Sequence, residues 1–344
     1  MGYLNITVMF IALVNMLFYP ISCAVSYTKL PLINTSLMVR ITGDTIINFL
    51  DPIFDDAVRN MIYKPEGDIT IKDVESIVSL NVSNLYISDL SGIEYFIALE
   101  ELYCNGNMLS RLDVSHNTKL ILLDCSENHL TRLDVSHNKL LRLLNCMGND
   151  IILLNLRGTA ALEVLDCTAN ERLSHLNLSD NIVLRVLLCG ITRLTVLDLS
   201  HNLQLEELVC GESRLHKLNI SKNNQLKTLV CYKNNLLALD TSHNDVLIDL
   251  ACDDNQLSVL DVNHNKDLRY FSCTGNRLVT LDVSHNIVLN TLACTDNLLT
   301  TLDVSNNTLL KTLYCQNNLF PDEDSISGLN KISLDSFVFH PQGR

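Results

Sequence analysis

The chain has 344 residues, of which 47% are hydrophobic and 6% aromatic, and it has no tryptophan, so a large core has to be aliphatic. Single compact cores stop growing at about 250–300 residues, but a repeat array escapes this limit because each unit contacts only its neighbours. The formal net charge of −14 favours solubility and argues against nucleic acid or an anionic membrane surface as the main partner.

The N-terminus has the character of a targeting segment. The chain is largely apolar from Ile6 to Ile21, its first charged side chain is Lys29, and Ser22-Cys23-Ala24 has the small residues of a cleavage site. We therefore predict a signal peptide over residues 1–24 and a secreted or cell-surface protein, although no Lys or Arg precedes the apolar run. An uncleaved membrane anchor, for which the run is short, and a lipid attached to Cys23 are the alternatives.

A linker over residues 25–48 and an N-terminal cap over residues 49–98 are expected next. Asp51-Pro52 predicts a helix that begins with proline just inside its first turn and runs to Tyr63. Such a segment can cover the apolar end of a stack of repeats, which would otherwise face water. The inward candidates of the helix are Ile53, Phe54, Val58 and Met61, and those of a degenerate first coil are Val74, Ile77, Leu80, Val82, Leu85, Ile87 and Leu90.

An internal repeat fills residues 99–320. Its unit is L-x-x-L-x-C-x-x-N-x-L-x-x-L-D-V-S-x-N-x-x, with a period of 21 residues except for one spacing of 22 between Cys167 and Cys189. A fixed period of this length predicts a solenoid of stacked coils. Ten full copies begin at residues 99, 120, 141, 162, 184, 205, 226, 247, 268 and 289, and a partial copy begins at Leu310.

Each recurring position within the unit has a physical reason. In the first half, Leu and Cys alternate with variable residues, as in a strand with one buried face. The following Asn stands at a turn, where its amide can bond backbone donors and acceptors. The second half, L-D-V-S-x-N, repeats this alternation before another turn. We therefore expect two parallel sheets of short strands, with little or no helix in the array.

With this unit, the array resembles bacterial secreted leucine-rich-repeat proteins of the 21-residue class. The resemblance covers roughly Leu99–Leu319, and the segment from Phe49 to Phe96 is similar to the cap that precedes such arrays. It implies a right-handed coil of mostly short parallel β-strands with a small helical N-terminal cap. It also implies an extracellular or surface binding role, and the family has no catalytic residues to carry over.

A C-terminal cap over residues 321–344 is expected where Pro321 stops the repeat. Apolar residues in the segment that follows can close the last coil, which a solenoid requires at both ends. The apolar candidates are Ile326, Leu329, Ile332, Leu334, Phe337, Val338 and Phe339.

The repeating cysteines could form disulfides, bind a metal or carry redox chemistry. Their spacing matches no zinc motif, and side chains that project the same way from stacked strands approach one another poorly for pairing. We therefore predict a column of buried, reduced thiols that act as small hydrophobes. The column consists of Cys104, Cys125, Cys146, Cys167, Cys189, Cys210, Cys231, Cys252, Cys273, Cys294 and Cys315.

Two further columns could collect a metal ion. Stacked carboxylates suit calcium, and clustered histidines suit a pH sensor or an adventitious metal. Hydrogen bonding to the adjacent turn and a solvated surface are the simpler interpretations, so we predict no metal site, no cofactor and no catalytic residue. The acidic column is Asp113, Asp134, Asn155, Asn177, Asp198, Asn219, Asp240, Asp261, Asp282 and Asp303, and the histidine column is His116, His137, His201, His243, His264 and His285.

The third and fifth residues of each unit should point outward from the first sheet. In the middle coils several of them are apolar or aromatic, and contiguous exposed apolar residues suggest an interaction site with a polar rim. Valine also suits any strand, which is the competing explanation. The predicted protein-binding residues, expected to be exposed, are Val186, Leu188, Glu207, Val209, Thr228, Val230, Tyr232, Asp249 and Tyr270.

The sequence thus favours a monomeric, non-catalytic protein-binding module, with adhesion or host contact as its context. An intracellular signalling adaptor or scaffold that uses the same array is the alternative. An enzyme with a site on the rim of the array and a passive structural element are two further hypotheses. Nothing in the sequence names the protein ligand, and membrane contact is expected only through the N-terminal segment.

Overall fold

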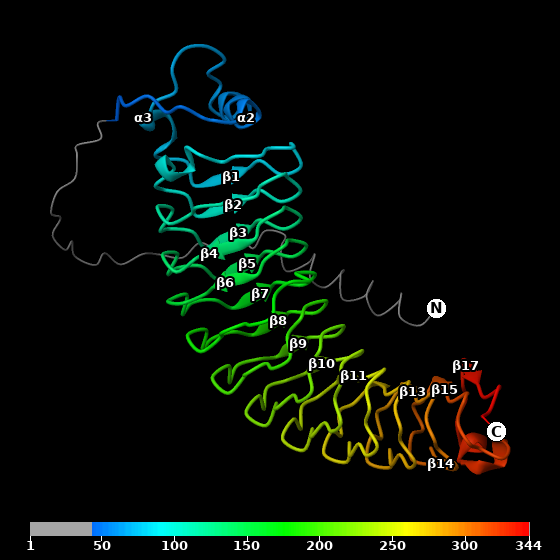
Figure 1. The fold of residues 1–344 in the computed structure, drawn as a ribbon. Helices are drawn as coiled ribbons and strands as arrows, with labels where there is room; N and C mark the ends of the chain where they lie inside the picture. Colours follow the sequence, from blue (N-terminus) through cyan, green and yellow to red (C-terminus); the bar gives the residue numbers. More distant parts are fainter. Residues whose placement is uncertain (1–42, 344) are drawn as a thin grey trace. The chain divides into compact units, whose positions relative to one another are not determined.

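The computed structural model describes residues 43–343. The predicted signal peptide and most of the predicted linker lie outside the described residues. Coils of the repeat stack one on another between the cap helix α2 (Pro52–Ile62) and the last strand β17 (Ser336–Val338) (Figure 1). The expected solenoid of short parallel strands with a small helical cap is therefore confirmed.

One strand from each coil joins a single thirteen-stranded parallel sheet. The register is regular, since the third, fourth and fifth residues of one unit lie opposite the same residues of the next, as in Leu208 opposite Leu229. The sheet comprises β1 (Ser79–Asn81), β2 (Glu101–Tyr103), β3 (Leu122–Asp124), β5 (Leu143–Asn145), β7 (Val164–Asp166), β8 (Val186–Leu188), β9 (Glu207–Val209), β10 (Thr228–Val230), β11 (Asp249–Ala251), β12 (Tyr270–Ser272), β13 (Thr291–Ala293), β15 (Thr312–Tyr314) and β17.

The prediction of a second sheet is wrong for most coils. In the second half of the repeat, the described residues form only two-stranded pairs, β4 (Arg132–Asp134) with β6 (Leu153–Asn155) and β14 (Leu302–Asp303) with β16 (Ile326–Ser327). In paired and unpaired coils alike, the Asp carboxylate of the unit bonds the backbone N–H two residues later, which turns the chain and keeps any strand here short. An example is Asp198, whose Oδ1 accepts from the Ser200 N–H at 3.0 Å.

The N-terminal cap follows the expected pattern, with two exceptions. Asp51 caps α2 by accepting from the N–H of Ile53 at 2.9 Å, and its other oxygen accepts from the Ser88 N–H at 2.7 Å, which ties the helix to the first coil. Phe54 and Val58 are buried as predicted, but Ile53 is 40% exposed because it lies in the first turn, beside the cap. Leu85 of the first coil is also exposed, contrary to expectation. A short helix α3 (Ile71–Val74) and a 3₁₀ turn (Ile93–Tyr95) complete this region.

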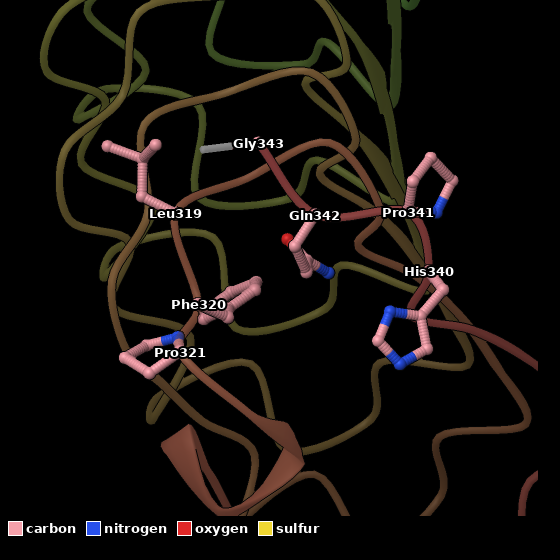
Figure 2. A pocket seen from close by; sticks show the side chains of 7 residues that line it. All are labelled: Leu319, Phe320, Pro321, His340, Pro341, Gln342 and Gly343. Atoms are coloured by element: carbon pink, nitrogen blue, oxygen red, sulfur yellow. The ribbon is translucent and has the colours of Figure 1, made fainter.

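At the C-terminal end, two 3₁₀ turns (Glu323–Ser325 and Leu329–Lys331) lead to β17, whose backbone pairs with β15. Ile326 and Phe339 are buried against the last coil. A hollow opens beside them, with Leu319, Phe320 and Pro321 on one side and His340 and Pro341 on the other (Figure 2). Between the two sides, Gln342 accepts from the Asn318 N–H at 2.9 Å and donates to the Cys315 carbonyl at 3.3 Å. The C-terminal cap is thereby hydrogen-bonded to the backbone of the last coil.

The eighth residue of every unit adopts a left-handed backbone, a feature that the sequence analysis missed. Its φ lies between 48° and 65° in all eleven units, although only three of them have glycine there. L-residues other than Asn and Asp rarely adopt this conformation, and a β-branched side chain makes it most costly. Ile191, with φ 53°, is the β-branched case.

Two columns of asparagine hold successive coils together. In the strand-side column (Asn107, Asn128, Asn149, Asn170, Asn234, Asn255, Asn276, Asn297 and Asn318), the amide bonds backbone on two coils. Asn234 is typical: its Nδ2 donates to the carbonyls of Cys210 at 3.0 Å and Cys231 at 3.1 Å, and its Oδ1 accepts from the Leu215 N–H at 2.9 Å. The predicted turn role of this residue is therefore confirmed, and the structure extends it to bonds between coils.

The turn-side column lies at the end of each unit and is bonded less completely. Asn223 donates to the carbonyls of Leu199 at 3.3 Å and Asn202 at 2.9 Å, whereas its Oδ1 is buried without a partner among the described residues. The same holds for the Oδ1 atoms of Asn117, Asn138, Asn181, Asn202, Asn244, Asn286 and Asn307.

Candidate protein-binding face

The cysteine column lies on the inner side of the thirteen-stranded sheet. All eleven cysteines of the array are free and buried. Burial raises the pKa of each thiol, for example that of Cys210 well above its usual value, so the thiolate is disfavoured. The prediction that the column is buried is confirmed, and burial leaves these thiols unreactive unless the coil opens.

The predicted binding residues lie together on the outer face of strands β8 to β12. The strand register places them in two rows that run across the sheet. The first outer row is Val186, Glu207, Thr228, Asp249 and Tyr270, and the second outer row is Leu188, Val209, Val230, Ala251 and Ser272.

The expectation that these residues are all exposed is wrong for part of the face. Leu188 is 6% exposed, Val230 2% and Glu207 9%, although none of the three points into the core. Neighbouring strands are only about 4.8 Å apart, so a branched side chain is covered by the side chains on either side of it in its row. Val186, Val209, Thr228, Tyr232, Asp249 and Tyr270 are half-buried and remain accessible.

Tyr232 lies across the end of the second outer row. Its ring sits so close above Gly211 that a β-carbon at that position would be 2.7 Å from a ring carbon. Burial raises the pKa of the Tyr232 phenol, and Glu212 adds to the effect. Lys233 lies beside the ring, with Nζ 5.9 Å from its centroid and 3.4 Å from Glu212 Oε1. Glycine after Cys210 thus makes room for an aromatic side chain on the outer face.

Glu207 and Asp249 form the acidic part of the first outer row. The Oε1 atom of Glu207 is buried and has no hydrogen-bond partner among the described residues. Burial raises the pKa of Glu207, and the nearby charge of Asp249 raises it further. Burial also raises the pKa of Asp249, while Arg269 and a hydrogen bond from Thr228 lower it.

Two other buried carboxyls on this face serve the fold. Asp166 accepts from the Thr168 N–H at 2.9 Å and Asp253 from the Thr274 N–H at 2.9 Å. Burial raises the pKa of each to about 6. Because the backbone bonds already use these carboxylates, they are structural parts of the strand ends.

The rim beside the sheet carries alternating charges from the second residue of successive units. Arg142 pairs with Glu163 at 2.7 Å, and Glu206 pairs with both Arg185 at 2.7 Å and Lys227 at 2.6 Å. The basic side chains of these pairs are about half exposed, so each pair contributes little to stability. They leave the rim close to neutral beside the acidic first outer row.

The acidic and histidine columns lie elsewhere, on the turns of the second half. The side-chain oxygens of the acidic column accept from backbone N–H groups two residues on, as in Asp240 from Ser242 at 2.9 Å, which confirms the expected turn role. The histidines are exposed, and several bond the preceding serine, as in His243 Nδ1 with the Ser242 hydroxyl at 3.0 Å. Among residues 43–343, no three His, Cys, Asp or Glu side chains are grouped to hold a metal ion.

The stacked parallel strands, the leucine core and the buried cysteine column define a leucine-rich-repeat solenoid with a cysteine ladder. Solenoids of this kind are typically interaction scaffolds, whose extended faces bind other molecules. In the part of the chain that the structure describes, no helix is both long enough and apolar enough to cross a membrane.

Solved structures with this fold include bacterial internalins. A domain of InlJ from Listeria monocytogenes, described as including a cysteine ladder, is 29% identical with a TM-score of 0.59, over 85% of this chain and 80% of the domain. The internalin InlF from Listeria monocytogenes is 22% identical with a TM-score of 0.66, over 86% of this chain and 96% of that one. The plant peptide hormone receptor RGFR1, in complex with RGF2, is 19% identical with a TM-score of 0.59, over 77% of this chain and 46% of the receptor. The last two likenesses concern the fold alone. No family profile and no curated protein matches the sequence.

Proposed function

We propose that this protein is a non-catalytic, monomeric binding module that recognises a protein or peptide ligand through the outer face of β8–β12. The supporting observation is that half-buried Val186 and Val209 lie on the neighbouring strands β8 and β9, with half-buried Tyr232 just after β10 and Tyr270 on β12. Aromatic and apolar side chains at the centre of a surface, with charged pairs at its edge, are typical of protein interfaces. The net charge of −14 disfavours nucleic acid as the ligand.

Secretion or display on the cell surface, with adhesion or host contact as the setting, remains part of this proposal, as does the division into a signal peptide, a linker, two caps and the array. The likeness to an internalin domain with a cysteine ladder supports it. The signal peptide can be tested by N-terminal sequencing of protein from the culture supernatant. A mature N-terminus near residue 25 supports secretion, and intact protein confined to the cytoplasm supports the adaptor alternative.

The binding face is tested by changing two of its valines together. In Val186→Gln with Val209→Gln, both side chains are half-buried on the outer face, so the fold should persist while the apolar surface is lost. The native array is used as bait, its retained proteins are identified, and their retention by the variant is measured. We expect retention to fall about tenfold or more, since tenfold corresponds to about 1.4 kcal/mol, less than the roughly 2 kcal/mol that one interface hot spot contributes.

A matched control uses Val196→Gln with Val259→Gln, since both valines are 73% exposed on the second half of their units. This variant should retain the partner like the native array, and both variants should melt as the native protein does. If the outer-face variant retains the partner unchanged, or the control loses it equally, the binding site lies elsewhere on the solenoid.

A further inference from the structure

Two adjacent glutamates have opposite electrostatic surroundings: Glu206 lies just before β9, and Glu207 is its first residue. Glu206 lies on the rim and pairs with Arg185 and Lys227, which hold its pKa below the usual range. Glu207 points to the outer face, is 9% exposed and has an Oε1 atom without a partner. The described residues therefore place two cations at the first carboxylate and none in an ion pair with the second.

A buried carboxylate oxygen without a partner is costly, because it has lost its hydration and gained no hydrogen bond. Such groups persist where something outside the folded chain completes them, or where a proton neutralises them. The nearby negative charge of Asp249 increases the free-energy cost of ionising Glu207. Glu207 thus has an unmet demand for positive charge, whereas Asp249 beside it is partly offset by Arg269 and by a hydrogen bond from Thr228.

The geometry suits a flat cation with several donors. Glu207 and Asp249 lie two strands apart, opposite Thr228 on the strand between them. Strand spacing places their backbones about 9–10 Å apart, which leaves room for one planar group over Thr228. The last torsion of Glu207 has a broad preference, so its carboxylate can turn part-way and bring an oxygen to a donor at the open face. A guanidinium has five N–H donors in a fixed fork and can bond both carboxylates at once.

We propose that Glu207, Thr228 and Asp249 form the receiving site for an arginine side chain of the protein partner. The inference rests on the proposed function, because it assigns the chemistry of the ligand to the same face. The arginine guanidinium bonds Glu207 and Asp249 from above the sheet, while Tyr270 and Val186 border the site within the first outer row. The surrounding apolar side chains exclude water, which strengthens the charge pair.

The site is tested with N-acetyl-arginine methylamide as the probe and N-acetyl-citrulline methylamide as its uncharged counterpart. Full-length protein with ¹³C-labelled side-chain carboxyls is titrated with each probe, and the Glu207 resonance is identified by its loss in Glu207→Gln. We expect the arginine probe, and not the citrulline probe, to shift this resonance. Affinity for the arginine probe should fall about tenfold in Glu207→Gln and in Asp249→Asn.

Glu206→Gln is the matched control, since it removes the adjacent carboxylate on the rim and should change affinity for the probe less than about twofold. The proposal is overturned if the arginine probe leaves the Glu207 resonance unmoved, or if Glu207→Gln and Glu206→Gln bind it equally. If the probe fails while the outer-face valine variant still loses the partner, the binding face stands and only the arginine site is excluded.

Discussion

The two halves of each coil are held together in different ways. On the strand side, backbone bonds run through a continuous thirteen-stranded sheet, and the asparagine amide is used at both ends. On the turn side, the described residues form only two separate pairs of short strands, and eight asparagine oxygens lack partners. Cohesion between coils is therefore concentrated on the strand side, which explains why the 22-residue unit places its extra residue, near Arg172, after the strand.

The largest effect is expected from a charge in the cysteine column. Cys210→Asp buries a carboxylate in a site of 0% exposure without a partner, so we expect a loss of about 3–5 kcal/mol in the free energy of unfolding, or failure to fold. Cys210→Val, similar in size and apolar, should cost less than about 1.5 kcal/mol. Denaturant unfolding measures both, and equal losses would show that the column tolerates charge and is not a core.

The contrast between the asparagine columns is tested by a pair of alanine variants. Asn234→Ala removes bonds to four backbone groups on two coils, the carbonyls of Cys210, Cys231 and Tyr232 and the N–H of Leu215, and should cost about 2–4 kcal/mol. Asn223→Ala removes two donated bonds and an oxygen that had no partner, so its cost should be about half as large. Denaturant midpoints in the same buffer compare them, and a larger loss for Asn223→Ala would reverse the assignment of cohesion to the strand side.

A smaller, pH-dependent effect is expected at Asp166. Its pKa of about 6 in the folded chain lies above the ordinary value of 3.8, so the native state binds more protons between these values. The free energy of unfolding contributed by this group therefore falls as pH rises from about 4 to about 6, and the loss persists above that range. Asp166→Asn keeps the acceptor for Thr168 and should stabilise the protein by roughly 1–3 kcal/mol at about pH 7.5 and not at about pH 4.

Asn145→Asp is the converse change, because Asn145 occupies the same position one coil earlier and accepts from the Met147 N–H at 3.1 Å. It should destabilise the protein at neutral pH and not at about pH 4. Unfolding measured across this pH range checks both variants. A gain for Asp166→Asn that is independent of pH would mean that buried charge is not the cause.

The smallest effect is expected at the left-handed eighth position. Ile191→Gly relieves a β-branched side chain at φ 53° and should stabilise by about 0.5–1 kcal/mol, after the entropy of glycine in the unfolded chain is counted. Gly148→Ala, where an added β-carbon meets nothing closer than 3.5 Å, should cost about 1 kcal/mol through backbone strain alone. Thermal melts compare the two. A destabilised Ile191→Gly would show that the contacts of the isoleucine outweigh its strain.

The strand side of the array could be predicted from the sequence, because leucine and cysteine alternate with variable residues and this pattern indicates a strand with one buried face. The prediction of a second sheet on the turn side was wrong: L-D-V-S also alternates, but the Asp carboxylate turns the chain directly afterwards, so the strands found there are only two or three residues long. The left-handed position was missed although Gly106, Gly148 and Gly275 stand there, which was the available signal. The burial of Leu188 and Val230 depends on neighbouring strands, so it follows from the register and not from any single unit.

The predicted binding residues were brought together as expected, because one unit length fixes which residues become neighbours across the sheet. What the sequence did not reveal is which of their charges lack a partner. Glu206 and Glu207 are adjacent and chemically identical, and only the positions of Arg185 and Lys227 distinguish them. Pairing across coils depends on side-chain direction, which a linear pattern does not specify for two neighbouring acids.

The regular register of the coils also has a genetic consequence. A duplication or deletion of 21 codons within the array returns every later residue to the column it occupied before, so leucines still face leucines and each asparagine still finds its carbonyls. Unequal recombination between units can therefore lengthen or shorten the gene while every residue keeps its place in the coil. Such events would move the outer-face residues relative to the caps as a block, so that a binding surface can be repositioned or doubled in one step.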